Sequence, residues 1–186
     1  AHVQSFHSIA APGAVGAIDW SAGEQPESDG RIAGEALTAS ESDLVVAISR
    51  YEAEVVVERC GADPCRVVVV APGVDSEQFR PLAPGEQPWS VAGAGQGQVL
   101  FAGRLQPLKG PDLAIEAVAG LRREVRPHLV LAGDVSADFA SYRGELEALV
   151  AARGVQDFVT FAGPLGRAKL AHAMRSSRAL LMPSYS

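Results

Sequence analysis

The residues best suited to chemistry lie in residues 103–110 (GRLQPLKG), between an apolar run and a helical pattern. Arg104 and Lys109 are five positions apart, so a bent loop can aim both cations at one point. The flanking glycines let the backbone approach a ligand, and a helix starting at Pro111 adds the positive end of its dipole. This combination suits a phosphate or diphosphate. The residue types alone equally allow Arg104 and Lys109 to be solvated loop charges.

His7 is a second candidate, because it directly follows the run at residues 2–6 that is predicted to form a strand. If that run is a parallel strand, His7 lies at its carboxyl end, which is where ligands of open α/β sheets bind. A lone histidine is more often packed or solvent-facing, so both interpretations remain open at this point.

Other chemistries fit less well. The sequence has no GxxxxGK[ST] motif, no GxSxG motif and no DxD pair, and its four histidines lack metal-ligand spacing. The glycine cluster at residues 93–97 precedes a strand pattern instead of following one, so it is interpreted as part of a linker. Cys60 and Cys65 form neither a CxxC pair nor a disulfide framework, and we interpret them as incidental reduced thiols. No metal is expected.

The composition indicates an ordinary globular protein. The 186 residues are 47% hydrophobic and 20% charged, which excludes disorder as the main state. No apolar stretch is long enough for a membrane span, and the N-terminus does not resemble a signal peptide. A net charge of −6 argues against a protein that coats nucleic acid. We therefore expect a cytoplasmic protein, with peripheral membrane association and homo-oligomers left open.

The elements that must position these residues alternate between β-branched runs and helical patterns, which predicts parallel sheets covered by helices. The continuous apolar runs at 44–48 and 66–71 are typical of strands buried on both faces. Residues 72–98 are rich in proline and glycine and indicate a linker. The predicted strands are 2–6, 44–48, 66–71, 98–102, 128–133, 157–162 and 178–182. The predicted helices are 31–40, 50–60, 111–125, one through Tyr142, Leu146, Leu149 and Val150 that stops at Gly154, and 167–177. Ser49 is predicted to cap the helix at 50–60, with Glu52 completing a capping box. Leu121 and Val125 recur at helical spacing on the apolar face of 111–125, and Leu170 and Met174 are predicted to face inward on 167–177.

Three segments together carry a resemblance: AISRYEAEVVVERCGADPCRVVVVAPGVDSEQF, LFAGRLQPLKGPDLAIEAV and ALLMPSYS. With their PGVDxxxF and GRxxxxKG motifs in this order, they resemble the family 4 retaining glycosyltransferases, and most of all the branch that acts on an inositol phosphate. The resemblance implies the α/β GT-B fold, with two Rossmann-like parallel-sheet domains that are both incomplete in this chain. It divides the chain into residues 1–75 of the acceptor-side domain, a linker at 76–98, and residues 99–186 of the nucleotide-sugar donor domain.

The resemblance also implies roles for particular residues. The residues that it implies bind the donor are Gly103, Arg104, Lys109 and Gly133. The catalytic residues are His7, Arg104 and Lys109. The residues that it implies bind the acceptor are Ser8 and Arg31. The backbone of residues 163–165 would face the nucleotide base. In this interpretation the two cations stabilise the leaving diphosphate, so no metal and no other cofactor is expected.

The implied reaction transfers a hexose from a nucleotide-diphosphate sugar of the UDP type to an acceptor hydroxyl, for which a phosphorylated polyol is one candidate. The partners expected are that donor and a small-molecule or lipid-linked acceptor, without nucleic acid or a membrane span. The family's first Glu of an E-x7-E pair would follow Ser186, so this segment alone is expected to be inactive. Two alternatives stay open: a non-catalytic nucleotide-diphosphate-binding module, and a related sucrose-phosphate or lipid-linked mannosyl transferase.

Overall fold

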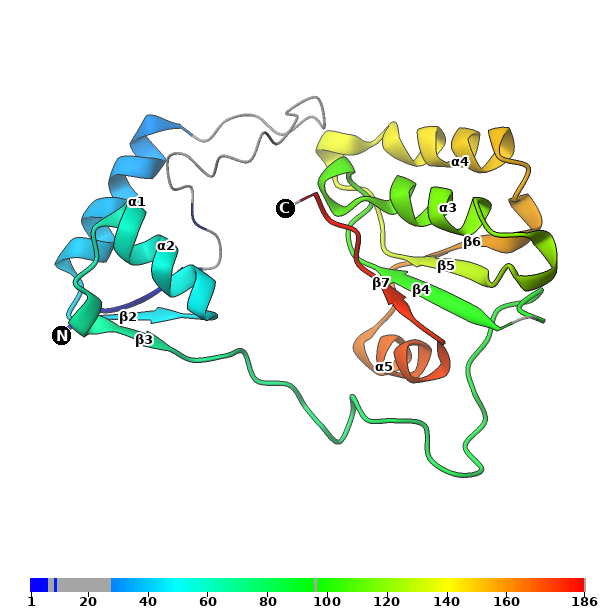
Figure 1. Cartoon of the computed structure of the whole chain (residues 1–186), viewed down its shortest axis with the longest axis horizontal. Coiled ribbons are helices and arrows are strands. Elements are labelled where there is room, and N and C mark those ends of the chain that lie inside the picture. Colours follow the sequence, from blue (N-terminus) through cyan, green and yellow to red (C-terminus); the bar gives the residue numbers. More distant parts are fainter. Residues whose placement is uncertain (7–8, 10–27, 96, 186) are drawn as a thin grey trace. The chain divides into compact units, whose positions relative to one another are not determined.

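The chain divides into two compact units of α/β structure, Ala1–Val74 and Asp75–Ser186. The computed structural model describes residues 1–6, 9, 28–95 and 97–185 (Figure 1). All described strand pairs in both units are parallel, which confirms the predicted α/β class with parallel sheets. Within the described ranges, no helix is both long and apolar enough to cross a membrane.

The first unit is a small sheet covered by two helices. Its strands lie in the order β1-β2-β3, with β2 in the middle. Its core joins Val45 of the central strand to Phe6, Val56 and Cys60. The elements in chain order are β1 (Val3–Ser5), α1 (Asp29–Glu41), β2 (Leu44–Ala47), α2 (Arg50–Cys60), a 3-10 turn (Pro64–Arg66) and β3 (Val67–Val69).

Both helices of the first unit begin at a serine. The Ser28 hydroxyl accepts a hydrogen bond from the Arg31 amide, and the Ser49 hydroxyl accepts one from the Glu52 amide. The Ser49 cap was predicted from the sequence. The return bond of the predicted capping box differs, because the Glu52 carboxylate accepts from the Ile48 amide, 3.3 Å away, in place of the Ser49 amide.

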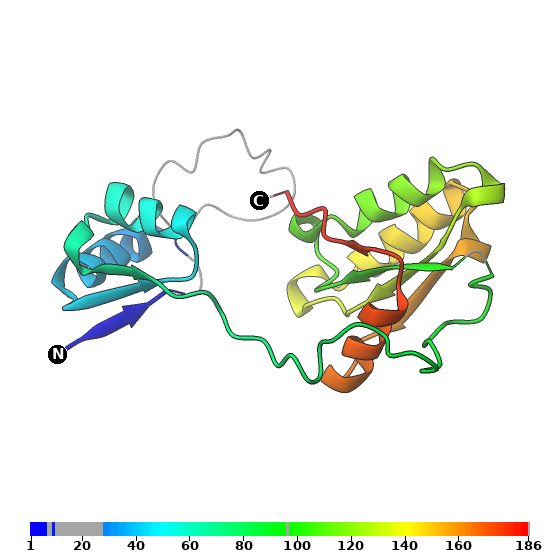
Figure 2. The same ribbon diagram turned by 60° about the horizontal axis from the view of Figure 1, so that its bottom comes forward.

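The prediction of a strand buried on both faces at 66–71 was wrong in its burial. β3 is shorter than predicted, and Val68 and Val69 are 39% and 48% exposed. Figures 1 and 2 show α1 and α2 on the same face of this sheet. No described element of this unit covers the opposite face, and β3 is an edge strand of its sheet. Two of its three valines, which point to opposite faces, are therefore exposed although the run is wholly apolar.

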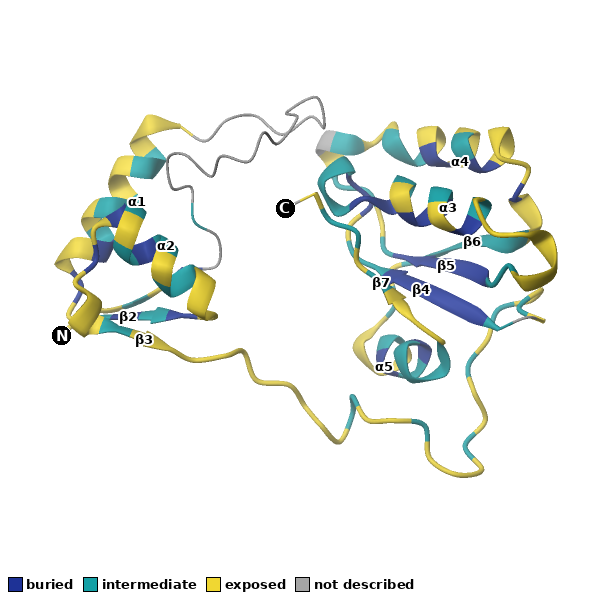
Figure 3. Cartoon of the chain, in the orientation of Figure 1, coloured by how far each residue is buried: buried dark blue, intermediate teal, exposed yellow. Residues whose placement is uncertain are grey.

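The second unit is a four-stranded parallel sheet with helices on both faces. Its strands lie in the order β6-β5-β4-β7, so β4 and β5 are the inner strands. Both inner strands are almost entirely buried, which Figure 3 shows in dark blue. The regular elements are β4 (Gln98–Ala102), α3 (Pro111–Ala119), β5 (His128–Ala132), α4 (Tyr142–Ala152), β6 (Val159–Gly163), α5 (Arg167–Ser176) and β7 (Leu180–Leu181).

Two hydrophobic clusters fill the two sides of this sheet. Alternate residues of the inner strands point to opposite faces, so Phe101 and Leu131 pack under α3 and α4. Leu100 and Val130 pack against Ala173 of α5 on the other side. Figure 2 separates α5 from the pair of α3 and α4 in the same way. This double cover explains why the apolar run at 98–102 is buried on both faces.

The helix predicted over 111–125 ends earlier, at Ala119. The Arg126 side chain donates to the carbonyl oxygens of Ala119 and Leu121, which satisfies acceptors that the end of a helix leaves open. Leu121 and Val125, predicted to face inward, are 42% and 53% exposed. A short 3-10 turn (Arg123–Val125) replaces the last predicted helical turn.

The described residues between β3 and β4 form no helix or strand, in agreement with their proline and glycine content. Those from residue 75 onward nevertheless belong to the second unit and make specific contacts with α5. For example, the Trp89 amide donates to the Ser176 hydroxyl at 2.9 Å. The predicted linker range of 76–98 therefore includes chain that packs on the second unit.

Candidate functional site

The order of the strands in the second unit marks one edge of its sheet as a binding site. From β4 the chain steps to β5 and β6 on one side, then returns past β4 to place β7 on the other side. In open α/β sheets, ligands bind outside the carboxyl ends of the strands where the strand order reverses. The candidate loop, residues 103–110, begins at this edge, directly after β4.

A cavity of about 540 Å³ opens at the same edge. This volume falls within the range of about 300–1,000 Å³ that is usual for small-molecule sites. Its lining comes from the ends of β4 and β5, from the connection between β6 and α5, and from α5 itself. Three of the residues predicted from the sequence to bind the donor are in this lining: Gly103, Arg104 and Gly133.

Gly133 is required by a close approach of two backbones. It has a φ of 153°, and a Cβ atom there would overlap the Gly103 carbonyl oxygen. The two loops are further joined by hydrogen bonds from the Gly103 amide to Ala132 and from the Leu105 amide to Asp134, at 3.0 and 2.9 Å. The glycine therefore fixes the spacing of the loops that form one wall of the cavity.

Arg104 and Lys109 have neither an ion pair nor a side-chain hydrogen bond with any described residue. Arg104 is exposed and lines the cavity. Lys109 ends a 3-10 turn (Pro107–Lys109) and is partly exposed, but it is not part of the cavity lining. Both cations can thus accept an anionic ligand without first breaking a contact, and only Arg104 is placed on the cavity wall.

Gly110 joins the 3-10 turn to α3 and lies against the chain that follows β7. Its φ is 64°, and a Cβ atom there would overlap the Pro183 carbonyl oxygen. One step further along, the Tyr185 amide donates to the Leu108 carbonyl oxygen at 2.9 Å. The chain that follows β7 therefore packs directly on the turn that carries Lys109.

Asp112, in the first turn of α3, was not identified from the sequence. Its carboxylate accepts hydrogen bonds from the hydroxyls of Tyr142 and Tyr185, both at 3.3 Å. Burial, and then the Asp112 charge, raise the pKa of the Tyr142 hydroxyl well above its usual range. Asp112 places a negative charge at the start of α3, so the dipole of this helix offers less to an anion than its bare N-terminus suggested.

The remaining predicted site residues belong to the first unit. Arg31 lies on α1, and its Nε donates to the Glu35 carboxylate at 2.9 Å. His7 and Ser8 lie outside the described residues, so their predicted roles stay predictions. In the described part of the chain, no group of three His, Cys, Asp or Glu side chains could hold a metal ion.

The apolar side of the cavity was predicted from the sequence only in part, through the backbone of residues 163–165. Leu165, Leu170 and Met174 all contribute to the lining. Leu170 and Met174 were predicted to face inward because they are four residues apart on a helix. Helical spacing finds the inward face of α5, but it does not distinguish a side chain that fills the core from one that lines a cavity.

Two family profiles match the chain. Residues 89–186, more than half of the chain, match the family described as glycosyl transferases group 1. Residues 1–78 match the family described as Glycosyltransferase Family 4. The two matched regions correspond broadly to the two compact units.

Curated relatives support the same family. The chain is 37% identical over 184 residues to a D-inositol 3-phosphate glycosyltransferase from Streptomyces coelicolor, which covers 88% of the chain and 40% of that relative. It is 38% identical over 194 residues to one from Stackebrandtia nassauensis, which covers 100% of the chain and 42% of the relative. The chain thus spans about two fifths of the length of these relatives.

Solved structures show the fold. The structure of Anabaena HepE in complex with UDP and glucose matches with a TM-score of 0.74 at 19% identity, over 98% of the chain and 46% of that protein. A sucrose-phosphate synthase from Thermosynechococcus elongatus matches with a TM-score of 0.73 at 22% identity, over 98% and 44%. The fold is that of the GT-B glycosyltransferases, of which this chain holds two partial parallel-sheet units. On the profile match over most of its second unit and on its relatives, the chain belongs to the glycosyl transferases group 1 family.

Proposed function

We propose that the chain is part of a retaining glycosyltransferase that moves a hexose from a UDP-type sugar to an acceptor hydroxyl. The observation that carries this proposal is the cavity at the carboxyl ends of β4 and β5, with Arg104 on its wall and without an ion-pair partner among the described residues. A cavity with a largely apolar lining and one cation suits a ligand with a flat, weakly polar end and an anionic end. A nucleoside diphosphate has both.

In the proposed donor complex, the nucleoside lies toward Leu165, Leu170 and Met174, and the diphosphate lies toward Arg104 and the 103–110 loop. As the bond between the sugar and the diphosphate breaks, negative charge grows on the leaving phosphate oxygens. Arg104 and Lys109 stabilise that charge, and the acceptor hydroxyl passes its proton to the leaving diphosphate. The HepE structures, which hold UDP, glucose and UDP-glucose, support a UDP-type donor.

The acceptor we propose is a phosphorylated polyol. The support is the naming of the curated relatives as D-inositol 3-phosphate glycosyltransferases, at 35–39% identity. We assign acceptor contacts to Ser8 and Arg31, and a place beside the donor sugar to His7, on the resemblance of residues 2–31 to that family. We further propose that two cationic side chains take the place of a metal, so chelation of divalent ions leaves turnover unchanged.

The test uses the full-length enzyme that contains this chain. We expect Arg104→Ala and Lys109→Ala each to lower kcat/KM by about 10²-fold or more, because each removes charge stabilisation from the transition state. Arg122→Ala is the matched control, since Arg122 is exposed and its side chain forms no hydrogen bond or ion pair with a described residue. Unchanged kcat/KM in both site variants would overturn the assigned roles.

A substrate panel decides the finer points. UDP-sugars are compared with other nucleotide sugars, and inositol 3-phosphate is compared with a hexose phosphate and a lipid-linked acceptor. We expect transfer from the UDP-sugar to inositol 3-phosphate, with the anomeric configuration of the donor kept in the product by NMR. Donor binding without transfer to any acceptor would favour the non-catalytic binding module instead.

A further inference from the structure

Helix α5 presents three different faces to its surroundings. Leu170 and Met174 line the cavity, and Ala171 and Ala173 are buried beneath the helix. The third face carries polar and charged residues and meets the chain that precedes β4. We call this chain, residues 78–91, the strap. The helix is therefore enclosed between the sheet on one side and the strap on another.

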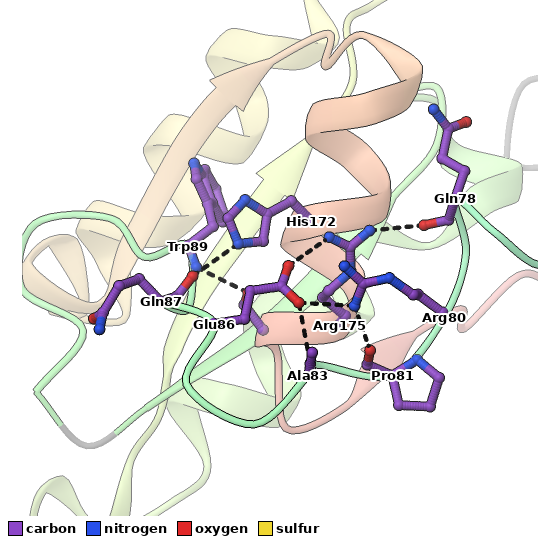
Figure 4. Close-up of polar contacts among 10 residues, drawn as sticks. Gln78, Arg80, Pro81, Ala83, Glu86, Gln87, Trp89, His172 and Arg175 are labelled. Carbon is purple, nitrogen blue, oxygen red and sulfur yellow. Dashed lines mark hydrogen bonds and ion pairs between the residues drawn. The ribbon is translucent and has the colours of Figure 1, made fainter.

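The strap contacts α5 at both ends of the helix and in the middle. The His172 Nε2 atom lies 3.0 Å from the Gln87 carbonyl oxygen. The Lys169 ammonium lies 5.9 Å from the centre of the Trp89 ring. Trp89 and Val91 also pack on the hydrophobic cluster that holds α5 to the sheet. Figure 4 shows Gln87 of the strap beside His172 of the helix, with Trp89 nearby.

Glu86 is the centre of this contact. Its carboxylate accepts from Arg175 of α5 at 2.9 Å, from Arg80 at 2.7 Å and from the Ala83 amide at 3.0 Å (Figure 4). Arg175 also donates to the Gln78 carbonyl oxygen at 2.7 Å. The hydrogen bond from Arg80, and then the one from Ala83, lower the pKa of Glu86 to about 2, so the carboxylate stays ionised at neutral pH.

The contact between Glu86 and Arg175 differs from an ordinary surface ion pair. Their side chains are 22% and 11% exposed, whereas the pair of Arg153 and Glu116 in the same unit is 51% and 38% exposed. Removing one partner of a shielded pair leaves the other charge short of both water and a counterion. The strap would then loosen along with the outer face of α5.

We propose that Glu86 and Arg175 are positioning residues that act through α5: the strap holds the helix so that Leu170 and Met174 form the nucleoside wall of the cavity. This inference rests on the proposed function, because the nucleoside is the ligand whose affinity it governs. Neither residue lines the cavity, so the effect passes entirely through the helix.

The test compares ligands in the 186-residue chain. We expect Glu86→Gln to weaken binding of UDP and of uridine by the same factor, about threefold to thirtyfold, measured by NMR titration. Arg104→Ala should weaken UDP and leave uridine unchanged. Glu77→Gln is the matched control, since Glu77 is an exposed acid just before the strap whose side chain forms no hydrogen bond or ion pair with a described residue. Val150→Ala destabilises the core under α4 and controls for a general loss of stability.

A second readout follows α5 itself. Hydrogen exchange of α5 amides should be faster in Glu86→Gln than in Glu77→Gln or Val150→Ala.

The double variant of Glu86→Gln with Arg175→Gln should lose no more affinity than the weaker-binding single variant, because the two residues act as one unit. Unchanged α5 exchange in Glu86→Gln, or unchanged uridine affinity alongside weakened UDP, would overturn the positioning role. If the unaltered chain binds neither ligand, the proposed function fails, and α5 exchange alone then decides the role of the strap.

Discussion

Two strands that both lie in largely apolar runs, β3 in the first unit and β4 in the second, differ sharply in burial. β4 is almost wholly buried, while Val68 and Val69 of β3 and the following Val70 are exposed. The difference lies in what covers each sheet. Helices pack on both faces of the second sheet, but in the first unit the described helices cover a single face. An apolar run thus predicts a strand, and its burial depends on neighbours that the run does not encode.

The helices of the two units differ in a complementary way. Both helices of the first unit begin with a serine that caps a backbone amide. None of α3, α4 and α5 in the second unit has a side-chain cap. The second unit therefore depends on its two hydrophobic clusters, while local signals at helix ends carry more weight in the first unit.

The largest effect should come from the core of the second unit. Phe101 is 1% exposed. We expect Phe101→Ala to lower the free energy of unfolding of this unit by about 3–5 kcal/mol, because it leaves a cavity in the core. Val68→Ala, at an exposed position of β3, should change the stability of the first unit by no more than about 0.5 kcal/mol. Hydrogen exchange in urea, followed on peptides from β4 and β2, reports the two units separately. Similar losses for both variants would break the comparison.

A smaller effect is expected at the helix caps. Ser49→Ala should cost about 1 kcal/mol in the first unit, because the Glu52 amide loses its acceptor. Ser141→Ala is the matched change at the start of α4, where the serine side chain caps no amide, and it should cost clearly less. The urea midpoints of peptides from α2 and α4 measure both. An equal cost at the two positions would mean that capping does not separate the units.

The smallest expected effect is a pH slope in the second unit. His128 is 4% exposed at the start of β5, and its Nε2 atom lies 2.7 Å from the Thr160 hydroxyl. Burial lowers the pKa of this imidazole, against a smaller opposite effect of the Gly93 backbone. The folded state therefore favours neutral His128. Its contribution to stability is complete above the ordinary pKa of 6.5 and is lost as pH falls through the lowered value.

The urea midpoint of β5 peptides should therefore fall as pH is lowered from 7.5 to 5.5. Glu86 does not contribute to this slope, since its pKa is lowered to about 2 and its own loss begins only below about pH 4.5. The His128→Gln variant should lack the slope. A slope of the same size in the variant would assign it to another group.

The order and type of the seven strands and five helices in the described residues were predicted from the sequence, because the spacing of apolar residues within a short segment distinguishes a helix from a strand. Helix ends were predicted less accurately. α3 stops at Ala119, whose carbonyl oxygen accepts from the Arg126 side chain, and this contact depends on how the chain turns after the helix. The packing of the strap on α5 could not be predicted from the sequence for a related reason. Its partners on α5 are 80 or more residues away, and proline and glycine content does not indicate what an irregular chain packs on.

The candidate site was predictable where glycines and cations are close in sequence. The 103–110 loop and Gly133 meet at one cavity wall, as the parallel strands require. Asp112 was missed because its tyrosine partners come from α4 and from the chain after β7. The placement of Lys109 away from the cavity lining also could not be foreseen, because the 3-10 turn that carries it breaks the simple picture of one bent loop.

The central claim is that the second unit binds a nucleoside diphosphate at the carboxyl ends of β4 and β5. Calorimetric titration of the 186-residue chain with UDP tests it directly, with Arg104→Ala and the control Arg122→Ala titrated in parallel. We predict binding that Arg104→Ala weakens by at least about tenfold, since a hydrogen bond to a charged group is lost, and that Arg122→Ala leaves intact. Absence of UDP binding, or equal affinity in all three proteins, would contradict the claim.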